Sequence, residues 1–302
     1  MRDFTRHLRK AVLQALQDDA INTAKATAYS GILMIFPALL VLTTGLALVP
    51  EGNSLLGEVR IAAEQVLPSD TMSLLQSYFQ SQRVYSLQVI LSAASLSSFA
   101  ALGVMLSLME GFRRAYRLPS RGWGFWHRRL RALLLGPIAL LPLSLATLIL
   151  VFGHPIEMWM IDNSGHELRT IVLVLWRLAR WSLALLTSTA VVSIIYHFGT
   201  RRKEHWLWVG PGAVAASVLW FPLTLAFGWY VTRFADYSMI YGSLGTGIAT
   251  LVWLYLTSFS ILLGAELNGV LYRERQARLA AQPQNLPIPT QISQSPRQHP
   301  SL

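Results

Sequence analysis

The sequence predicts an all-α fold: a polytopic membrane helix bundle with six transmembrane helices and both termini in the cytoplasm. The 302 residues are 53% hydrophobic and only 13% charged, which is about half the charged fraction of a soluble globular domain. Six apolar stretches are each long enough to cross the roughly 30 Å hydrocarbon core as a helix. Basic residues gather on alternate connections between these stretches. Such a composition argues against a soluble enzyme and against a disordered chain.

The six predicted spans contain few ionisable residues, and they lack the polar and apolar alternation of a membrane β-strand. They cover approximately residues 31–49, 89–109, 130–153, 181–198, 207–230 and 245–270. About thirty residues precede the first span, including Asp18 and Asp19. A cleaved signal peptide begins with a short basic segment, so we expect the first span to be a retained helix.

The basic residues give the orientation. Of the 25 Lys and Arg residues, nineteen fall on one side of this topology and four on the other. The nineteen lie in residues 1–30, 113–131, 201–203 and 273–297. The excess of basic residues in cytoplasmic segments therefore places both termini inside. Most of the net charge of +10 follows from topology, and no nucleic-acid-binding module is recognisable. We expect membrane lipids with anionic headgroups as partners, and no nucleic acid.

The chain divides into three parts. Residues 1–30 form an N-terminal cytoplasmic segment, and residues 31–271 form the membrane domain, with a helical external loop at 50–88. Residues 272–302 form a basic and then disordered tail rich in Pro and Gln. In the first part, Phe4, Leu8, Val12 and Leu16 recur every four residues among basic side chains. This amphipathic helix can lie on the inner leaflet or pack against the bundle, and the sequence leaves both open.

Arg177 and Arg180 lie at the predicted start of the fourth span, flanked by Trp176 and Trp181. Arg180 precedes Arg201 by 21 residues, about 31 Å along a helix, so we expect the pair at the outer boundary. One interpretation is that the two side chains snorkel to the interface. The other is that they grip one phosphate or other anion, since residues three apart share a helix face.

A second group of candidate residues lies toward the cytoplasmic side. Glu266 interrupts an otherwise apolar span, about two turns before Arg273. Glu110 ends the second span just before Arg113, and Lys25 precedes the first span on a helical face shared with Asp18 and Asn22. A buried ionisable residue in a span is costly and suggests function. These residues form either a structural ion-pair network or a polar cavity for substrate.

A glycine-rich segment, residues 242–247, opens the last span next to Tyr241 and includes Ser243. No βαβ unit precedes it, so a dinucleotide site is not expected. Its free amides could bind an anion, or its small residues could let helices approach closely. We therefore include Tyr241 and Ser243 among the candidate substrate-binding residues.

Motifs for catalysis are lacking. The chain has no Cys, no HExxH spacing among its seven His residues and no GxSxG elbow. His154 and His166 share one external loop with acidic residues, where a solvated polar loop is favoured over a metal site. We expect no enzyme, no catalytic residues, no cofactor and no bound metal.

Three sequence blocks are specific enough to compare with known families. They are Ala28-Tyr29-Ser30 leading to Phe36-Pro37; residues 108–117 followed by Phe125-Trp126; and Tyr241-Gly242-Ser243-Leu244-Gly245 leading to residues 263–268. With these blocks, residues 18–271 resemble the YihY/BrkB family of bacterial inner-membrane proteins. The resemblance implies six spans with both termini inside and a multi-pass location in the inner membrane. Family members often have Asn where this chain has Arg113.

The resemblance implies several activities. The family has carried a ribonuclease label, and members have been linked to serum resistance and to moving lipids or lipopolysaccharide precursors. Dispersed carboxylates and His residues disfavour a ribonuclease here. The favoured function is a transporter or flippase of an anionic lipid or other anionic amphiphile. The alternative is a structural or scaffolding membrane protein, with a homo-oligomer interface at the glycine-rich segment.

Overall fold

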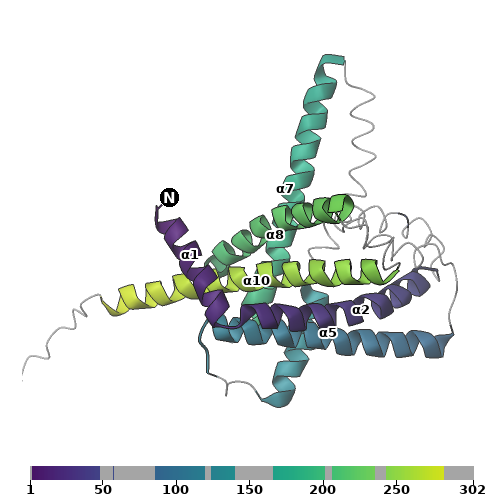
Figure 1. Cartoon of the computed structure of the whole chain (residues 1–302), viewed down its shortest axis with the longest axis horizontal. Coiled ribbons are helices and arrows are strands. Elements are labelled where there is room, and N and C mark those ends of the chain that lie inside the picture. The colour runs from purple at the N-terminus through teal and green to yellow at the C-terminus, as the bar shows by residue number, and fades with distance from the viewer. Residues whose placement is uncertain are drawn as a thin grey trace, which may run out of the picture.

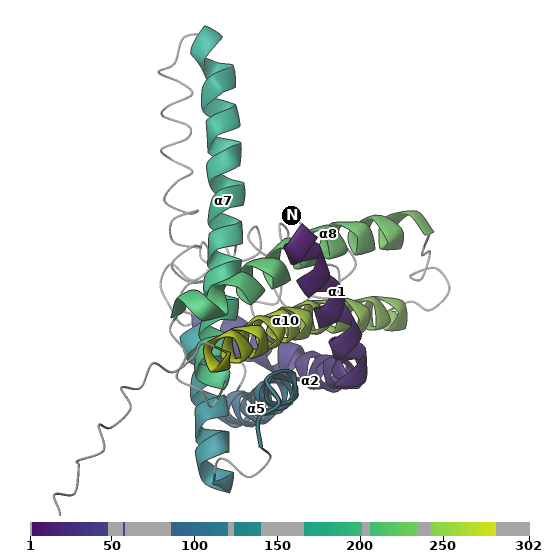
Figure 2. The same cartoon turned by 90° about the vertical axis from the view of Figure 1, so that its left-hand side faces the viewer.

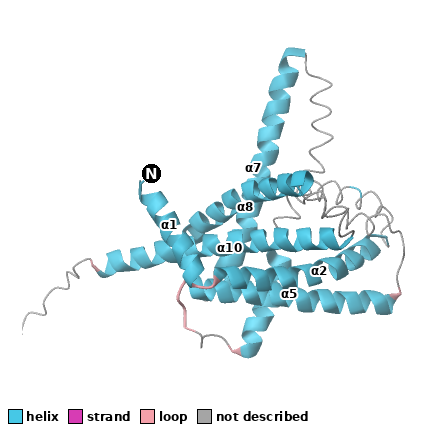
Figure 3. Cartoon of the chain, in the orientation of Figure 1, coloured by secondary structure: helices cyan, strands magenta, loops and turns pink. Residues whose placement is uncertain are grey.

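The computed structural model describes residues 2–47, 57, 86–119, 124–139, 166–200, 206–234 and 243–281 (Figure 1). All regular structure within these residues is helical (Figure 3). The helices are α1 (Arg2–Gln17), α2 (Ala20–Ala47), α5 (Leu87–Ala115), α7 (His166–Gly199), α8 (Trp206–Phe234) and α10 (Ser243–Ala280). One further helix covers residues 125–139.

Five of the predicted spans are confirmed as helices that are long and apolar enough to cross a membrane. These helices cover Ala20–Gly45, Leu87–Ala115, Val174–Gly199, Trp206–Val231 and Gly245–Ala280. The remaining predicted span begins in the helix over residues 125–139 and continues outside the described residues. The helices expected in the loop 50–88 and the tail from residue 282 also lie outside them, apart from residue 57. The count of six and the cytoplasmic termini therefore stay predictions.

α10 is the central helix of the bundle. It packs against α1, α2, α5 and α8, and α2 packs along α5. α7 crosses these helices steeply; it packs against α8, and its N-terminal part extends away from them (Figures 1 and 2). α7 begins at His166, about four turns before the predicted span at 181–198. Arg177 and Arg180 consequently lie inside a continuous helix.

α8 and α10 come into backbone contact near one end of the bundle, where the two helices converge (Figure 1). A Cβ at Gly264 would run into the carbonyl oxygen of Gly212 and would lie 2.8 Å from Cβ of Ala216. By contrast, a Cβ at Gly247 would meet no heavy atom within 4 Å. A backbone contact with α8 therefore occurs about five turns along α10, beyond the glycine-rich segment 242–247, whose own predicted close approach stays a prediction.

Asn268 reinforces the same crossing. Its Oδ1 accepts a hydrogen bond from the Gly212 amide at 2.7 Å, and its Nδ2 donates to the Val209 carbonyl at 2.9 Å. The Asn268 side chain is buried, so both backbone groups of α8 are satisfied away from water. Pro211 lies between these two residues within the helix, where a proline disrupts the regular backbone pattern. Asn268 thus binds the two residues on either side of the Pro211 step.

α1 and α2 are separated by a two-residue turn at Asp18 and Asp19. Asp19 has a left-handed backbone with φ 62°, a conformation that Asp adopts more readily than most residues. The turn redirects the chain, so α1 crosses α10 instead of extending α2 (Figure 1). Asp18 and Asp19 are thereby brought to the end of the bundle where α5 also ends.

Candidate functional site at the charged end of the bundle

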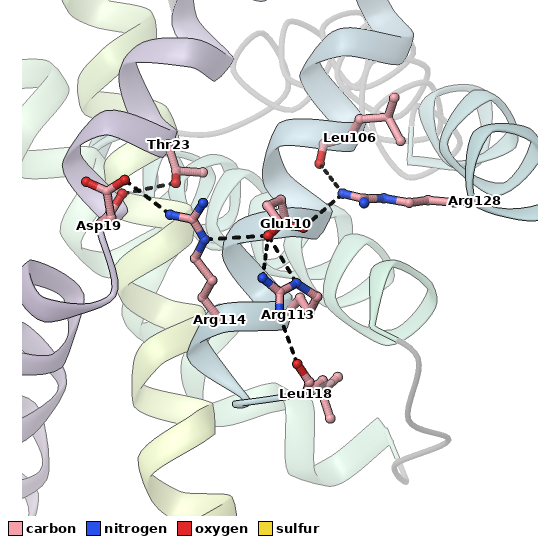
Figure 4. A network of polar contacts seen from close by, with 8 residues as sticks. All are labelled: Asp19, Thr23, Leu106, Glu110, Arg113, Arg114, Leu118 and Arg128. Carbon is pink, nitrogen blue, oxygen red and sulfur yellow. Dashed lines mark hydrogen bonds and ion pairs between the residues drawn. The ribbon is translucent and has the colours of Figure 1, made fainter. Parts of the chain in front are cut away.

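Charged side chains gather at this end, which we call the charged end: the α1–α2 turn, residues 110–118, residues 266–274 and Arg128. Glu110 is its hub (Figure 4). Glu110 Oε1 accepts from Arg113 Nη2 at 2.6 Å and from Arg113 Nε at 3.0 Å. Arg128 Nη2 donates to Glu110 Oε2 at 3.1 Å, and Arg114 Nε lies 3.5 Å from Oε1. One carboxylate thus holds three arginines.

The same arginines connect the hub to the neighbouring elements (Figure 4). Arg113 Nη1 donates to the Leu118 carbonyl at 3.0 Å, which fixes the chain after α5. Arg128 Nη2 also lies 3.3 Å from the Leu106 carbonyl, which joins the helix over residues 125–139 to α5. Arg114 Nη1 lies 3.2 Å from Asp19 Oδ2. With three arginines against Glu110 and Asp19, this partly exposed network keeps a positive excess.

Glu266 lies in a separate and deeper group. Its residue is only 2% exposed, and Oε2 has no hydrogen-bond partner among the described residues. The charged groups that act on it are Asp18, Arg273 and Arg117. Asp18 Oδ2 is likewise buried without a partner among the described residues. The sequence prediction that Glu266 is a buried carboxylate is confirmed, and Asp18 is the carboxylate that accompanies it.

Arg273 ties this deeper group to two other helices. Its Nη1 donates to the Ala115 carbonyl at 2.6 Å, and its Nη2 donates to Gln14 Oε1. Gly269, one turn earlier on α10, lies against the same Ala115 carbonyl, so that a Cβ there would collide with it. The end of α5 therefore rests directly on α10, beside Glu266.

Lys25 lies at the exposed outer end of the Glu110 network, which it reaches through Asn22 and Asp19. Asn22 Nδ2 donates to Asp19 Oδ1 at 2.7 Å, and Lys25 Nζ lies 3.4 Å from Asn22 Oδ1. The sequence predicts a helical face shared by Asp18, Asn22 and Lys25. In the structure Asp19 takes the place of Asp18 on this face, because the turn positions Asp19 to bond Asn22. Lys25 is exposed. The structure therefore brings together Glu110 with Arg113, and Glu266 with Asp18, but it places Lys25 on the rim.

The other predicted candidates are less fully described. Arg177 and Arg180 lie on α7, and their side chains fall outside the described residues, as does all of Tyr241. Ser243 is the first residue of α10, and its side chain is also outside them. Their predicted contact with an anion stays a prediction.

Sequence reasoning does not find Asn268, Arg273 or Arg128. Asn268 carries a signal, since a buried amide in a span needs partners. From the sequence, Arg273 is taken to mark the inner membrane boundary, although it is the first basic residue after Glu266 on α10. Arg128 lies 18 residues from Glu110, and no periodicity links residues on different helices. In the part of the chain that the structure describes, no three His, Asp or Glu side chains are grouped to hold a metal.

We predict that Glu110→Gln lowers the free energy of unfolding by about 1–2 kcal/mol, between the values for surface and buried ion pairs. The three arginines would then repel one another without a central anion. Added salt screens that repulsion, so the difference from wild type should shrink as salt rises. Thermal unfolding in detergent at low and high salt measures both effects. Lys25→Gln, on the exposed rim, should change neither the stability nor its dependence on salt. If the loss of stability in Glu110→Gln is the same at low and high salt, repulsion between the arginines is not its cause.

Comparisons with known proteins agree with the helical membrane architecture. The family model for virulence factor BrkB matches residues 11–289. The chain is 29% identical over 251 residues to a protein of Bacillus subtilis (strain 168) named as ribonuclease-like, YfkH, covering 82% of this chain and 89% of that protein. It is 24% identical over 283 residues to a UPF0761 membrane protein of Legionella pneumophila (strain Corby), covering 90% and 63%.

A UPF0761 membrane protein of Aromatoleum aromaticum (strain DSM 19018 / LMG 30748 / EbN1) is 28% identical over 278 residues. That match covers 87% of this chain and 63% of the relative, so the chain spans under two thirds of both UPF0761 relatives. No solved structure matches the chain. Because the family model covers nearly the whole sequence and the helices are apolar and long, the chain is a multi-pass membrane protein that belongs to the BrkB (UPF0761) family.

Proposed function

We propose that this protein moves an anionic lipid, or another anionic amphiphile, across the inner membrane of a bacterium. The observation that carries the proposal is Glu266, a carboxylate that is 2% exposed and lacks a partner for Oε2 among the described residues. An ionisable group held inside a membrane helix is expensive and is typically retained where a substrate or a proton passes. The charged groups that act on it electrostatically belong to three different segments, the α1–α2 turn, the turn after α5 and α10.

The arginines of the charged end supply the attraction for an anion. Arg113, Arg114 and Arg128 surround Glu110 and carry more positive charge than Glu110 and Asp19 neutralise. Arginine binds phosphate through paired N–H donors, so a phosphate headgroup entering here would compete with Glu110 for them. Glu266 would take up or release a proton and so couple movement to a proton gradient. Arg177 and Arg180 would receive the headgroup at the opposite face.

The test is lipid movement in proteoliposomes that hold the purified full chain. A fluorescent phosphatidylglycerol and a matched phosphatidylcholine are compared by quenching of the outer leaflet. We predict that wild-type protein moves the anionic lipid faster, and that Glu266→Gln lowers that rate at least about tenfold, the effect of losing about 1.4 kcal/mol. Lys25→Gln is the control and should match wild type, because Lys25 lies on the exposed rim.

Two results would remove this assignment. If Glu266→Gln and Arg177→Ala both move lipid at the wild-type rate, these residues are not the site. If wild-type protein moves neither lipid, the transport function fails as a whole. A scaffolding protein is then favoured, and one observation supports it: a Cβ added at Gly247 of α10 would have no atom of the described residues within 4 Å. Such an open face leaves room for a helix of a second copy.

A further inference from the structure

We propose that α1 is an interfacial helix whose outward face is embedded in the headgroup region of an anionic leaflet, while its inward face stays fixed on α10. This interaction surface is independent of any transport activity. It combines in one helix the two roles that the sequence leaves as alternatives.

The inward face of α1 is small and polar. Ala11 and Ala15 are both 0% exposed, and α1 packs against α10. Glu274 of α10 accepts from Lys10 Nζ at 2.7 Å and pairs with His7 Nε2 at 2.5 Å. Gln14 accepts from Arg273 of α10. These contacts use one side of the helix, and they fix which side is left facing outward.

The outward face of α1 is apolar with a basic edge. Its large apolar side chains are exposed to 36% at Leu8, 39% at Val12, 51% at Leu13 and 55% at Leu16. At about 100° per residue, Leu8, Val12 and Leu16 form one continuous stripe. Arg6 and Arg9 are exposed and lie beside that stripe, next to Leu13. An apolar stripe bordered by arginines is typical of a helix lying in the membrane interface, with its long basic side chains reaching the headgroups.

The position of α1 favours the membrane leaflet over a soluble protein as the partner of its outward face. Only the turn at Asp18 and Asp19 separates α1 from the spanning helix that begins at Ala20. α1 also pairs with Arg273 and Glu274 of α10, three and four residues after the predicted end of the last span at residue 270, so α1 is held at the level of the membrane boundary. Residues 2–17 carry four Arg or Lys residues and one acidic residue, so the charge of α1 complements anionic lipid. A soluble partner would need no such tether, and a zwitterionic surface would gain little from the arginines.

The chain has no Cys, so a single introduced cysteine can carry a spin label at one known place. We compare Val12→Cys, on the apolar stripe, with Gln17→Cys, which is exposed on α1 but outside the stripe. The full-length protein is placed in vesicles of phosphatidylcholine with and without phosphatidylglycerol. Accessibility of each label to oxygen and to a water-soluble nickel chelate is then measured. Both positions are exposed, so the labelled proteins should elute and unfold as wild type does.

We expect the Val12→Cys label to be open to oxygen and shielded from nickel in anionic vesicles, while the Gln17→Cys label stays open to nickel. Adding Arg6→Gln and Arg9→Gln together should weaken the shielding, most strongly where the anionic fraction is low. Equal nickel accessibility at the two positions in anionic vesicles would overturn the proposal, because the stripe would face water. Dipolar broadening between Val12→Cys labels would overturn it as well, by assigning the stripe to a second copy of the chain.

Discussion

Gly264→Ala is expected to destabilise the protein by about 3 kcal/mol, at the upper end of the usual cost of overpacking. The added Cβ would collide with the Gly212 carbonyl oxygen and would lie 2.8 Å from Cβ of Ala216. Neither atom belongs to a flexible side chain, so α8 and α10 must move apart. Separation would also stretch the hydrogen bonds of Asn268 to Gly212 and Val209. Gly264→Val, with a larger side chain, should yield no folded protein. Thermal unfolding monitored by size-exclusion chromatography in detergent gives the comparison.

Gly247→Ala is the matched control on the same helix. A Cβ there meets nothing within 4 Å, and alanine favours a helix over glycine by about 1 kcal/mol. We therefore expect unchanged or slightly raised stability at this position. Equal behaviour of Gly264→Ala and Gly247→Ala would show that α8 and α10 do not touch through their backbones.

Asn268→Leu is expected to cost about 1–3 kcal/mol, the net contribution of the two hydrogen bonds that join α10 to α8. The replacement has a similar size, so the loss comes from the Gly212 amide and the Val209 carbonyl and not from a void. The free energy of unfolding in mild detergent, from denaturant titration, measures the effect.

The control for this prediction is Gln276→Leu, which makes a comparable exchange of an amide for an apolar side chain on α10. Gln276 is exposed, so its replacement should change stability by no more than about 0.5 kcal/mol. If both variants lose the same stability, the cause is the general loss of an amide from α10. The bridge from Asn268 to α8 would then contribute nothing measurable.

Hydropathy predicts the helices of this fold well where apolar content alone decides them. α5, α8 and α10 contain the stretches expected from the sequence, and α2 contains the first of them as far as Ala47, because a membrane helix must satisfy its backbone internally and cover it with apolar side chains. α7 shows the limit of that reasoning. Its first turns carry His, Glu and Arg and lie outside any apolar window, yet they continue the helix from His166.

The site is predictable only in part, for a related reason. Burial of Glu266 follows from the apolar residues on both sides of it, and pairing of Glu110 with Arg113 follows from a spacing of three on one helix. Arg128, Asp18 and Asn268 act across helices, and their partners depend on how the helices cross. The backbone contact at Gly264, outside the glycine-rich segment 242–247, has the same origin. Several segments contain small residues, and the point where two helices cross decides which of these segments makes the close backbone contact.

Contact between backbones at Gly212 and Gly264 also limits how this protein can open. Two helices that meet without side chains between them, and that share the Asn268 bridge, have little room to slide past each other, so we expect α8 and α10 to move together. α1, in contrast, contacts α10 through ion pairs and buried alanines. Added salt should therefore weaken the contact of α1 with α10 more than the contact between α8 and α10.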